Sequence, residues 1–191
     1  MPRPSRRDHL VDTALKLFNQ NGYNATGIDL ILKESGVAKM TLYNHFRSKE
    51  DLILAALQRR NDQFCDWIMD FVETRATAPR DRLLTLFDAY HEWFSENDYR
   101  GCMFLNAAAE FSGNSDAILR ASRETKQLLR SYIRGLALAL NVENPDRLAD
   151  TMMLLLEGAI SCSHVSGNAD WSTKAKSAAD ILIGSEVNLA A

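Results

Sequence analysis

The sequence contains few of the residues that interrupt or cross-link a chain. Its 191 residues include four prolines, nine glycines and three cysteines. Proline and glycine are the poorest helix formers, so their scarcity favours a helical protein. The cysteines, Cys65, Cys102 and Cys162, are odd in number and widely spaced, which predicts neither a disulfide framework nor a zinc site. We expect no metal site and no cofactor.

Long apolar runs and catalytic motifs are also missing from the sequence. No apolar run approaches the roughly 18 residues needed to span a bilayer, and the basic first residues are not followed by the apolar segment of a secretory signal. We therefore expect a cytoplasmic protein without a membrane partner. The sequence has no P-loop, GxSxG motif or metal-ligand cluster, so we expect no catalytic residues and no enzyme activity.

Charge is distributed unevenly along the chain, whose net charge is -3. Residues 1–60 hold ten Lys or Arg against six Asp or Glu, whereas residues 61–191 hold twelve against nineteen. Only the N-terminal third therefore has the charge of a surface that binds a polyanion. Arg3, Arg6 and Arg7 precede the first expected helix, either as a solvated tail or within reach of DNA phosphates or the minor groove.

Apolar periodicity and helix-ending residues predict three short helices in the first 50 residues. The first helix is expected between a Ser5 cap and Gly22, because glycine readily ends a helix. Thr26-Gly27 is expected to open the second helix, because the Thr hydroxyl can accept a backbone N–H and Gly tolerates a tight approach. Ser35-Gly36 then breaks the pattern, and a third helix is expected from Lys39 to His45.

The third helix has seven residues and is too short to be stable by itself, so it must pack against the first two. Leu42 and Phe46 provide its inward side. This layout is a helix-turn-helix, in which the first helix supports a second helix in the major groove of DNA.

The outward side chains of the third helix suit DNA. Asn44 can pair bidentately with adenine and Thr41 can contact a base, and each good bidentate contact discriminates by about 1 to 3 kcal/mol. The residues better suited to phosphates, which position a protein without reading sequence, are Thr26, Lys39, Tyr43 and His45. For His45, a partly buried packing role is the alternative.

Residues 7–57 resemble the DNA-binding domain of the TetR/AcrR family of regulators. The resemblance lies in the segments ALKLFNQNGYNATGIDLI and SGVAKMTLYNHFRSKEDL and in the long helical pattern that follows them. It implies a homodimer with one DNA-reading head per subunit and a C-terminal domain that dimerises and binds a small ligand. Carried over residue by residue, it places Thr26, Lys39, Tyr43, His45 and Lys49 at phosphates and Met40, Thr41 and Asn44 nearest the bases of double-stranded operator DNA.

We therefore predict an all-α protein of about nine helices, with a DNA-binding domain over residues 1–50 and a ligand-binding and dimerisation domain over residues 51–191. Ser48 is expected to cap a helix of roughly 25 residues, or about 40 Å. Further helices are expected from Pro79 to about Glu96, over residues 102–111 and 116–141, from Pro145 to His164 and over residues 172–187.

A mixture of aromatic and polar side chains in the middle helices predicts a largely apolar ligand pocket. Its expected lining is Phe64, Trp67, Ile68, Tyr90, His91, Phe94, Met103, Asn106, Glu110, Phe111 and His164. Small and apolar residues of the last two helices predict a four-helix dimer interface, unless these faces are buried within one subunit. The expected interface residues are Leu148, Met152, Leu155, Ala159, Ala175, Ala178, Ile181 and Leu182.

The sequence thus predicts a DNA-binding transcriptional regulator, in the form of a homodimeric repressor that a small effector releases from its operator. The alternative is a DNA-binding regulator controlled by a protein partner or a redox signal.

Overall fold

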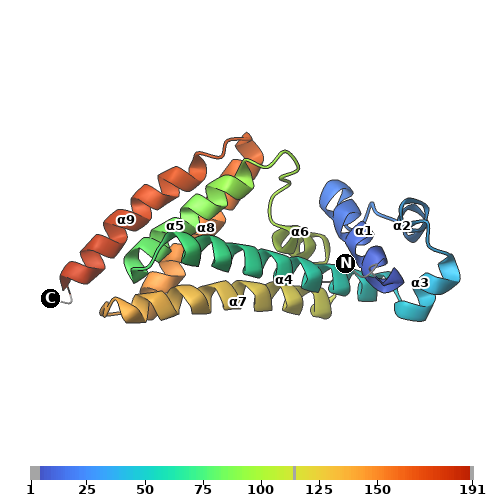
Figure 1. The fold of residues 1–191 in the computed structure, drawn as a ribbon, viewed down its shortest axis with the longest axis horizontal. Coiled ribbons are helices and arrows are strands. Elements are labelled where there is room, and N and C mark those ends of the chain that lie inside the picture. The colour runs from blue at the N-terminus through green and yellow to red at the C-terminus, as the bar shows by residue number, and fades with distance from the viewer. Residues whose placement is uncertain (1–4, 114, 190–191) are drawn as a thin grey trace. The chain divides into compact units, whose positions relative to one another are not determined.

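The computed structural model describes residues 5–113 and 115–189, which form nine helices and no strand (Figure 1). The helices are α1 (Arg6–Asn21), α2 (Ile28–Ser35), α3 (Lys39–His45), α4 (Lys49–Arg75), α5 (Pro79–Phe94), α6 (Met103–Glu110), α7 (Asp116–Ala139), α8 (Pro145–Ser166) and α9 (Trp171–Leu189). The expectation of an all-α protein is confirmed. Arg3 lies outside the described residues, and Arg6 and Arg7, which were expected before the first helix, are the first two residues of α1.

The chain divides into two compact units. Unit 1 consists of Met1–Phe64 and Cys102–Thr125, and unit 2 consists of Cys65–Gly101 and Lys126–Ala191. Unit 1 therefore contains α6 in addition to the three N-terminal helices, whereas the sequence-based boundary lay between residues 50 and 51. The two boundaries differ because residues far apart in the sequence contact each other in unit 1. No local sequence pattern predicts such contacts.

Most helix ends follow from local sequence. The Ser5, Ser48 and Asn144 side chains accept backbone N–H groups at the starts of α1, α4 and α8. Pro79 and Pro145 occupy the first positions of α5 and α8, where a missing N–H costs nothing.

The start of α2 differs from the expectation. Its N-cap is Gly27, which makes no side-chain cap bond. The Thr26 hydroxyl instead donates to the carbonyl oxygens of Gly22, at 2.7 Å, and Leu17, at 3.3 Å. The expected cap role of Thr26 is therefore wrong, because its hydroxyl closes the preceding turn rather than opening the helix.

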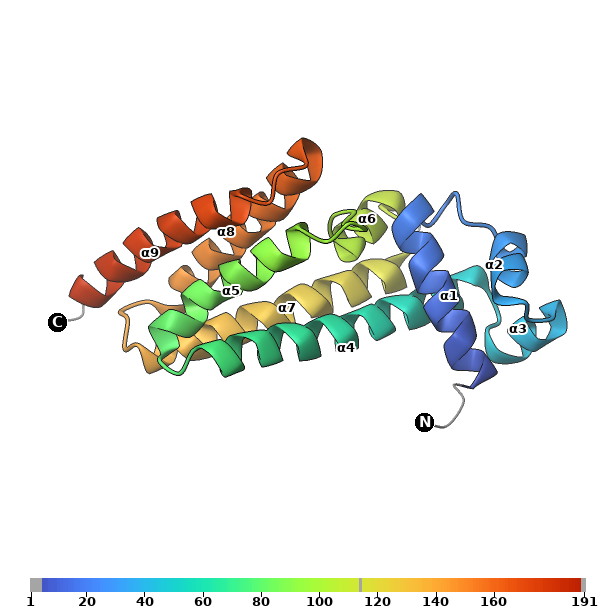
Figure 2. The same cartoon turned by 45° about the horizontal axis from the view of Figure 1, so that its top comes forward.

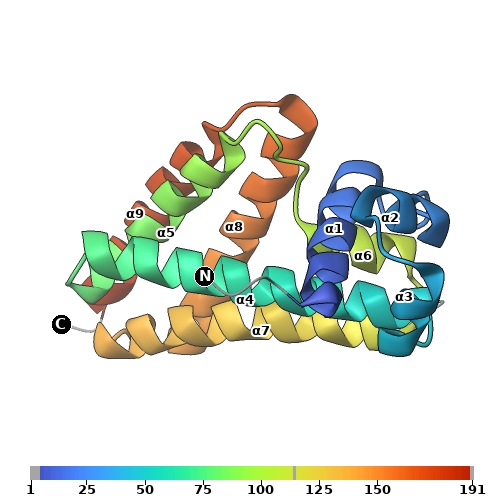
Figure 3. The ribbon, with the colours of Figure 1, turned by 45° about the vertical axis from the view of Figure 1, so that its right-hand side comes forward.

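Unit 1 is built on an apolar core that α1 shares with α2 and α3, which lie together in Figure 3. The buried residues are Leu10, Val11, Ala14, Leu17 and Phe18 of α1, Ile31 of α2 and Leu42 of α3, followed by Phe46. Arg59 of α4 pairs with Asp8 at 2.6 Å and with Asp12 at 3.0 Å. These two ion pairs fix α1 to the first half of α4.

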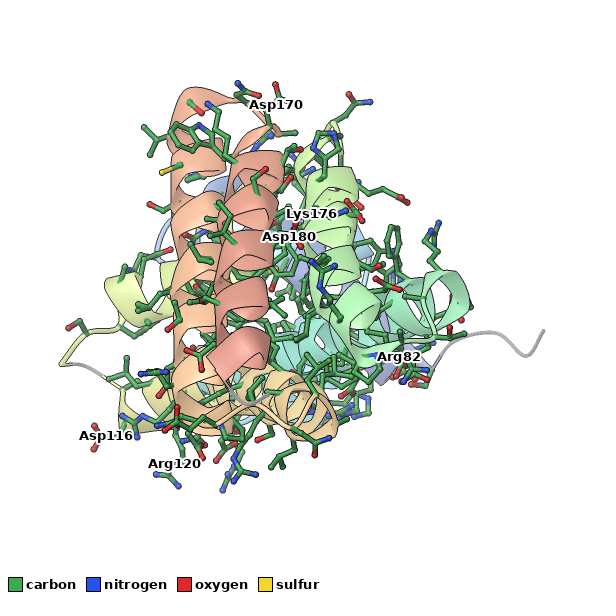
Figure 4. The ribbon with its side chains drawn as sticks, turned by 90° about the vertical axis from the view of Figure 1, so that its left-hand side faces the viewer. Arg82, Asp116, Arg120, Asp170, Lys176 and Asp180 are labelled. Atoms are coloured by element: carbon green, nitrogen blue, oxygen red, sulfur yellow. The ribbon has the colours of Figure 1, made fainter. Side chains whose placement is uncertain are left out.

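Unit 2 contains α5, α8 and α9, which pack against one another (Figures 1 and 2). Lys176 and Asp180 of α9 lie on the side toward α5 (Figure 4), where they pair with Asp88 and Arg80. The pairs are partly exposed, so they orient the two helices more than they stabilise them. Among the described residues, no helix has the length and apolar content needed to cross a membrane.

Candidate DNA-binding surface

Helix α3 is attached to unit 1 by one side. Leu42 is its buried residue, and Phe46, directly after it, is buried too. The Arg7 guanidinium lies 5.3 Å from the centre of the Phe46 ring, and His9 Nε2 lies 3.0 Å from the Ser35 carbonyl oxygen. Side chains of α1 thus contact both the turn before α3 and the residue after it, which holds this short helix in place.

The opposite side of α3 is open to solvent. Met40 is 77% exposed, Thr41 is half-buried, and the other expected DNA contacts on this helix are exposed: Lys39, Tyr43, Asn44 and His45. The structure therefore brings six of the eight expected DNA-binding residues onto one short helix. Base readout requires a helix that exposes polar side chains on one side and is held by packing on the opposite side.

Lys39 is only weakly engaged, since its Nζ lies 4.0 Å from an Asp29 carboxylate oxygen and both side chains are largely exposed. Such a pair is readily exchanged for a phosphate. His45 is exposed, and its ring lies edge-on to Phe46 with centroids 6.3 Å apart. His45 thus combines an exposed ring with one packing contact, and its phosphate role stays a prediction.

The other two expected DNA contacts are not on α3: Thr26 is in the turn between α1 and α2, and Lys49 is the first residue of α4. Thr26 is fully buried, so its side chain is unavailable to a phosphate. Lys49 is half-buried, and its Nζ donates to the Asn24 carbonyl oxygen at 3.5 Å. Burial lowers the pKa of Lys49 below its usual value, while the nearby Glu110 carboxylate opposes that shift.

Arg47 is a basic residue that the sequence analysis did not single out. Its side chain is exposed, and its Nε pairs with a carboxylate oxygen of half-buried Asp51 at 3.2 Å. A surface pair of this kind contributes little, so the guanidinium is available to a phosphate. Its position two residues after His45 was the signal that could have identified it.

The eleven residues expected to line a ligand pocket fall into both units. Unit 1 holds Phe64, Met103, Asn106, Glu110 and Phe111, and unit 2 holds Trp67, Ile68, Tyr90, His91, Phe94 and His164. In unit 2, Tyr90 and Phe94 belong to a group of rings that includes Trp93 and Tyr99, with neighbouring centroids 5.1 to 5.8 Å apart.

Several of these side chains already have other partners. The Glu110 carboxylate accepts two backbone N–H groups in unit 1. His91 Nδ1 lies 3.2 Å from both the Ala169 carbonyl oxygen and the Ser172 hydroxyl. His164 is exposed and lies edge-on to Tyr99.

The expected dimer interface is divided between the interior and the surface of unit 2. Leu148, Met152 and Ala159 are buried within the single chain, so these three do not form a free face. Leu155, Ala175 and Leu182 are half-buried, and Ala178 and Ile181 are exposed. The sequence missed two exposed apolar residues of α8, Leu154 and Val165.

Three helices, the last of which is short and exposes a polar side, define a helix-turn-helix DNA-binding protein. Comparison with known proteins agrees: the family of bacterial regulatory proteins, tetR family, matches residues 10–56, and the tetracyclin repressor-like C-terminal domain matches residues 79–179. The chain therefore belongs to the TetR family, whose members are DNA-binding transcriptional regulators and not enzymes.

Individual relatives support this assignment. The chain is 39% identical over 101 residues to the transcriptional activator FasR of Mycolicibacterium smegmatis, a match that covers 53% of this chain and 45% of FasR. It is 30% identical over 167 residues to the transcriptional repressor DhaR of a Mycobacterium species, covering 84% and 83% of the two chains. A TetR-family regulator from Streptomyces coelicolor has the same fold, with a TM-score of 0.88 at 23% identity over 95% of this chain and 96% of that one.

Proposed function

We propose that this regulator is a homodimeric repressor whose α3 helices read an operator and whose C-terminal part binds a small, largely apolar effector that releases it. The observation that carries the proposal is the exposed polar side of α3, backed by buried Leu42 and Phe46. Met40, Thr41 and Asn44 are assigned to the bases, and Lys39, Tyr43, His45, Arg47 and Lys49 to phosphates.

The sign of regulation is proposed from the relatives. DhaR is named a repressor, and its match covers 84% of this chain. FasR is named an activator, and its match covers 53% of this chain. The longer match includes more of the C-terminal part, and it favours repression. A reporter gene behind the selected operator tests the sign, because a repressor lowers its expression and an activator raises it.

The dimer is proposed from exposed apolar side chains on α8 and α9. Leu154 and Val165 of α8 are 73% and 84% exposed, and they lie eleven residues apart, on one side of the helix. Ile181 of α9 is 76% exposed, and the exposed Ala178 is one turn away. A pair of packed helices that exposes such residues fits a four-helix interface across a two-fold axis.

Effector control is proposed from the C-terminal match and from the aromatic group around Tyr90, Phe94 and Tyr99. Aromatic side chains provide the large apolar surface that small-ligand sites use. The ligand would favour a dimer shape whose two reading helices no longer match successive major grooves, about 34 to 36 Å apart. DNA and effector would then oppose each other reciprocally.

The deciding experiment selects bound sequences from a random DNA pool and then screens small apolar compounds for release of the selected DNA. Enrichment of a palindromic sequence supports a dimeric reader, and a compound that weakens binding supports effector control. Failure to enrich any sequence would contradict operator binding. Light scattering that gives a monomer at micromolar concentration would contradict the dimer.

A further inference from the structure

The turn between α1 and α2 is hydrogen-bonded to α6, although about 85 residues separate them. The Glu110 carboxylate accepts the backbone N–H of Tyr23 at 3.0 Å and that of Asn24 at 2.7 Å. In return, the Tyr23 hydroxyl donates to the Met103 carbonyl oxygen at 3.0 Å. Met103 and Glu110 are the first and last residues of α6. Both ends of this helix are therefore bonded to the same residue, Tyr23.

Gly22 allows this close approach. Its φ of +81° favours glycine, and a β-carbon at this position would lie 3.0 Å from a Glu110 carboxylate oxygen. A side chain at residue 22 would therefore crowd the carboxylate and require it to move by a few tenths of an ångström.

Glu110 is an unfavourable residue for its own helix. A negative charge at a helix C-terminus opposes the helix dipole, and the last turn of α6 holds no basic residue. Residues that violate a local rule are found where a longer-range role requires them. Two backbone N–H groups from the turn supply the positive partial charge that α6 itself lacks.

The same turn is contacted from α4 as well as α6. Asn24 donates its N–H to Glu110 and accepts Lys49 Nζ at its carbonyl oxygen. Its chain continues through buried Thr26 into α2, the first helix of the helix-turn-helix. The position of the turn therefore fixes both the start of α2 and one hydrogen-bond partner of Lys49.

We propose that Glu110 is a positioning residue for DNA binding: its carboxylate holds Tyr23 and Asn24 so that α2, and Lys49 beside the turn, are correctly placed on the operator. Glu110 itself does not touch DNA. Tyr23 assists by bonding the other end of α6, and the proposal rests on the operator binding proposed above.

A purely electrostatic role for Glu110 makes the opposite prediction. A carboxylate near a DNA-binding surface repels phosphates, so removing its charge would strengthen binding. Positioning predicts weaker binding from the same change, because glutamine keeps the size of the side chain but can accept with only one oxygen. The sign of the affinity change separates the two roles.

The test compares Glu110→Gln with Glu124→Gln in the full chain, using DNA that the wild type selects from a random pool. Glu124 is an exposed carboxylate of α7 in the same unit, so the control removes equal charge. We expect Glu110→Gln to weaken binding about 5-fold or more, the lower limit of typical coupling between sites, and Glu124→Gln to leave it unchanged or slightly stronger. Unchanged or stronger binding by Glu110→Gln overturns the proposal.

One further measurement excludes a general loss of folding, and a second variant tests the bond at the other end of α6. Amide hydrogen exchange should show faster exchange at Tyr23 and Asn24 in Glu110→Gln, with unchanged protection in α8. Tyr23→Phe leaves Glu110 in place and removes only the bond to Met103, so it should also weaken operator binding.

If the wild type selects no DNA sequence, the proposal of operator binding itself is wrong. If it selects one and Glu110→Gln binds it at least as tightly as the wild type, only the positioning role is wrong.

Discussion

Opposite sides of α3 should respond differently to the loss of an apolar side chain. Leu42 is fully buried and is the buried residue of this seven-residue helix, whereas Met40 is 77% exposed. Truncating a buried leucine to alanine costs about 2 to 5 kcal/mol, while surface substitutions change stability by about 0.5 kcal/mol or less. Leu42→Ala therefore tests the attachment of α3, and Met40→Ala is its control.

The expected changes in melting temperature follow from these energies. In a chain of this size, each kcal/mol shifts the midpoint by about 2 to 4 °C, so Leu42→Ala should lower it by about 4 to 20 °C. Met40→Ala should lower it by no more than about 2 °C. Thermal unfolding followed by circular dichroism measures both.

Operator titration completes the comparison at a temperature where both variants are folded. Leu42→Ala should weaken binding to all sequences, because α3 loses the contact that holds it. Met40→Ala should alter base preference while the protein remains as stable as the wild type. Equal losses of melting temperature in the two variants, or no loss in Leu42→Ala, would refute the reasoning that one buried side chain holds this helix.

Other predictions concern the bases, the dimer and pH. Asn44→Ala should relax base preference by about 1 to 3 kcal/mol, whereas Lys49→Ala should weaken binding to all sequences and reduce its salt slope by about one; indistinguishable selection and salt profiles would contradict this division. Ile181→Glu should give a monomer by light scattering, and an equally stable dimer would remove Ile181 from the interface. Burial, with Cys102 and Glu110 nearby, raises the pKa of Tyr23 above its usual 10.0. Above pH 10 the unfolded chain therefore loses the Tyr23 proton while the folded protein keeps it, so the free energy of unfolding falls as pH rises past 10. Urea titrations of Tyr23→Phe should show a smaller alkaline loss, and a loss equal to that of the wild type would contradict this.

Local features of the sequence were sufficient to predict α3 and the start of α4. The break at Gly36, the inward Leu42 and the Ser48 cap act over a few residues, so their effects can be deduced without knowing the fold. Thr26 shows the limit of such reasoning. A threonine before a helix can cap it or donate to a nearby carbonyl, and the choice depends on the shape of the preceding turn.

Contacts between distant residues could not be predicted in this way. Glu110 and Tyr23 are 87 positions apart, and no periodicity relates them. The dimer face was difficult for a different reason: α8 is apolar on more than one side. Met152 is buried within the chain and Leu154 is exposed, yet both belong to the same run of methionine and leucine, so the pattern alone does not identify the free side.

Lys49 links the turn to the proposed phosphate contacts. Its ammonium group has three N–H donors and uses one of them on the Asn24 carbonyl oxygen, so it can hold the turn and still donate to a phosphate. A guanidinium carries the same charge but is planar and has its donors in a fixed fork. We therefore expect Lys49→Arg to bind the operator more weakly than the wild type. Titration at one salt concentration measures this, and binding equal to the wild type would mean that the charge of residue 49 matters while its contact with Asn24 does not.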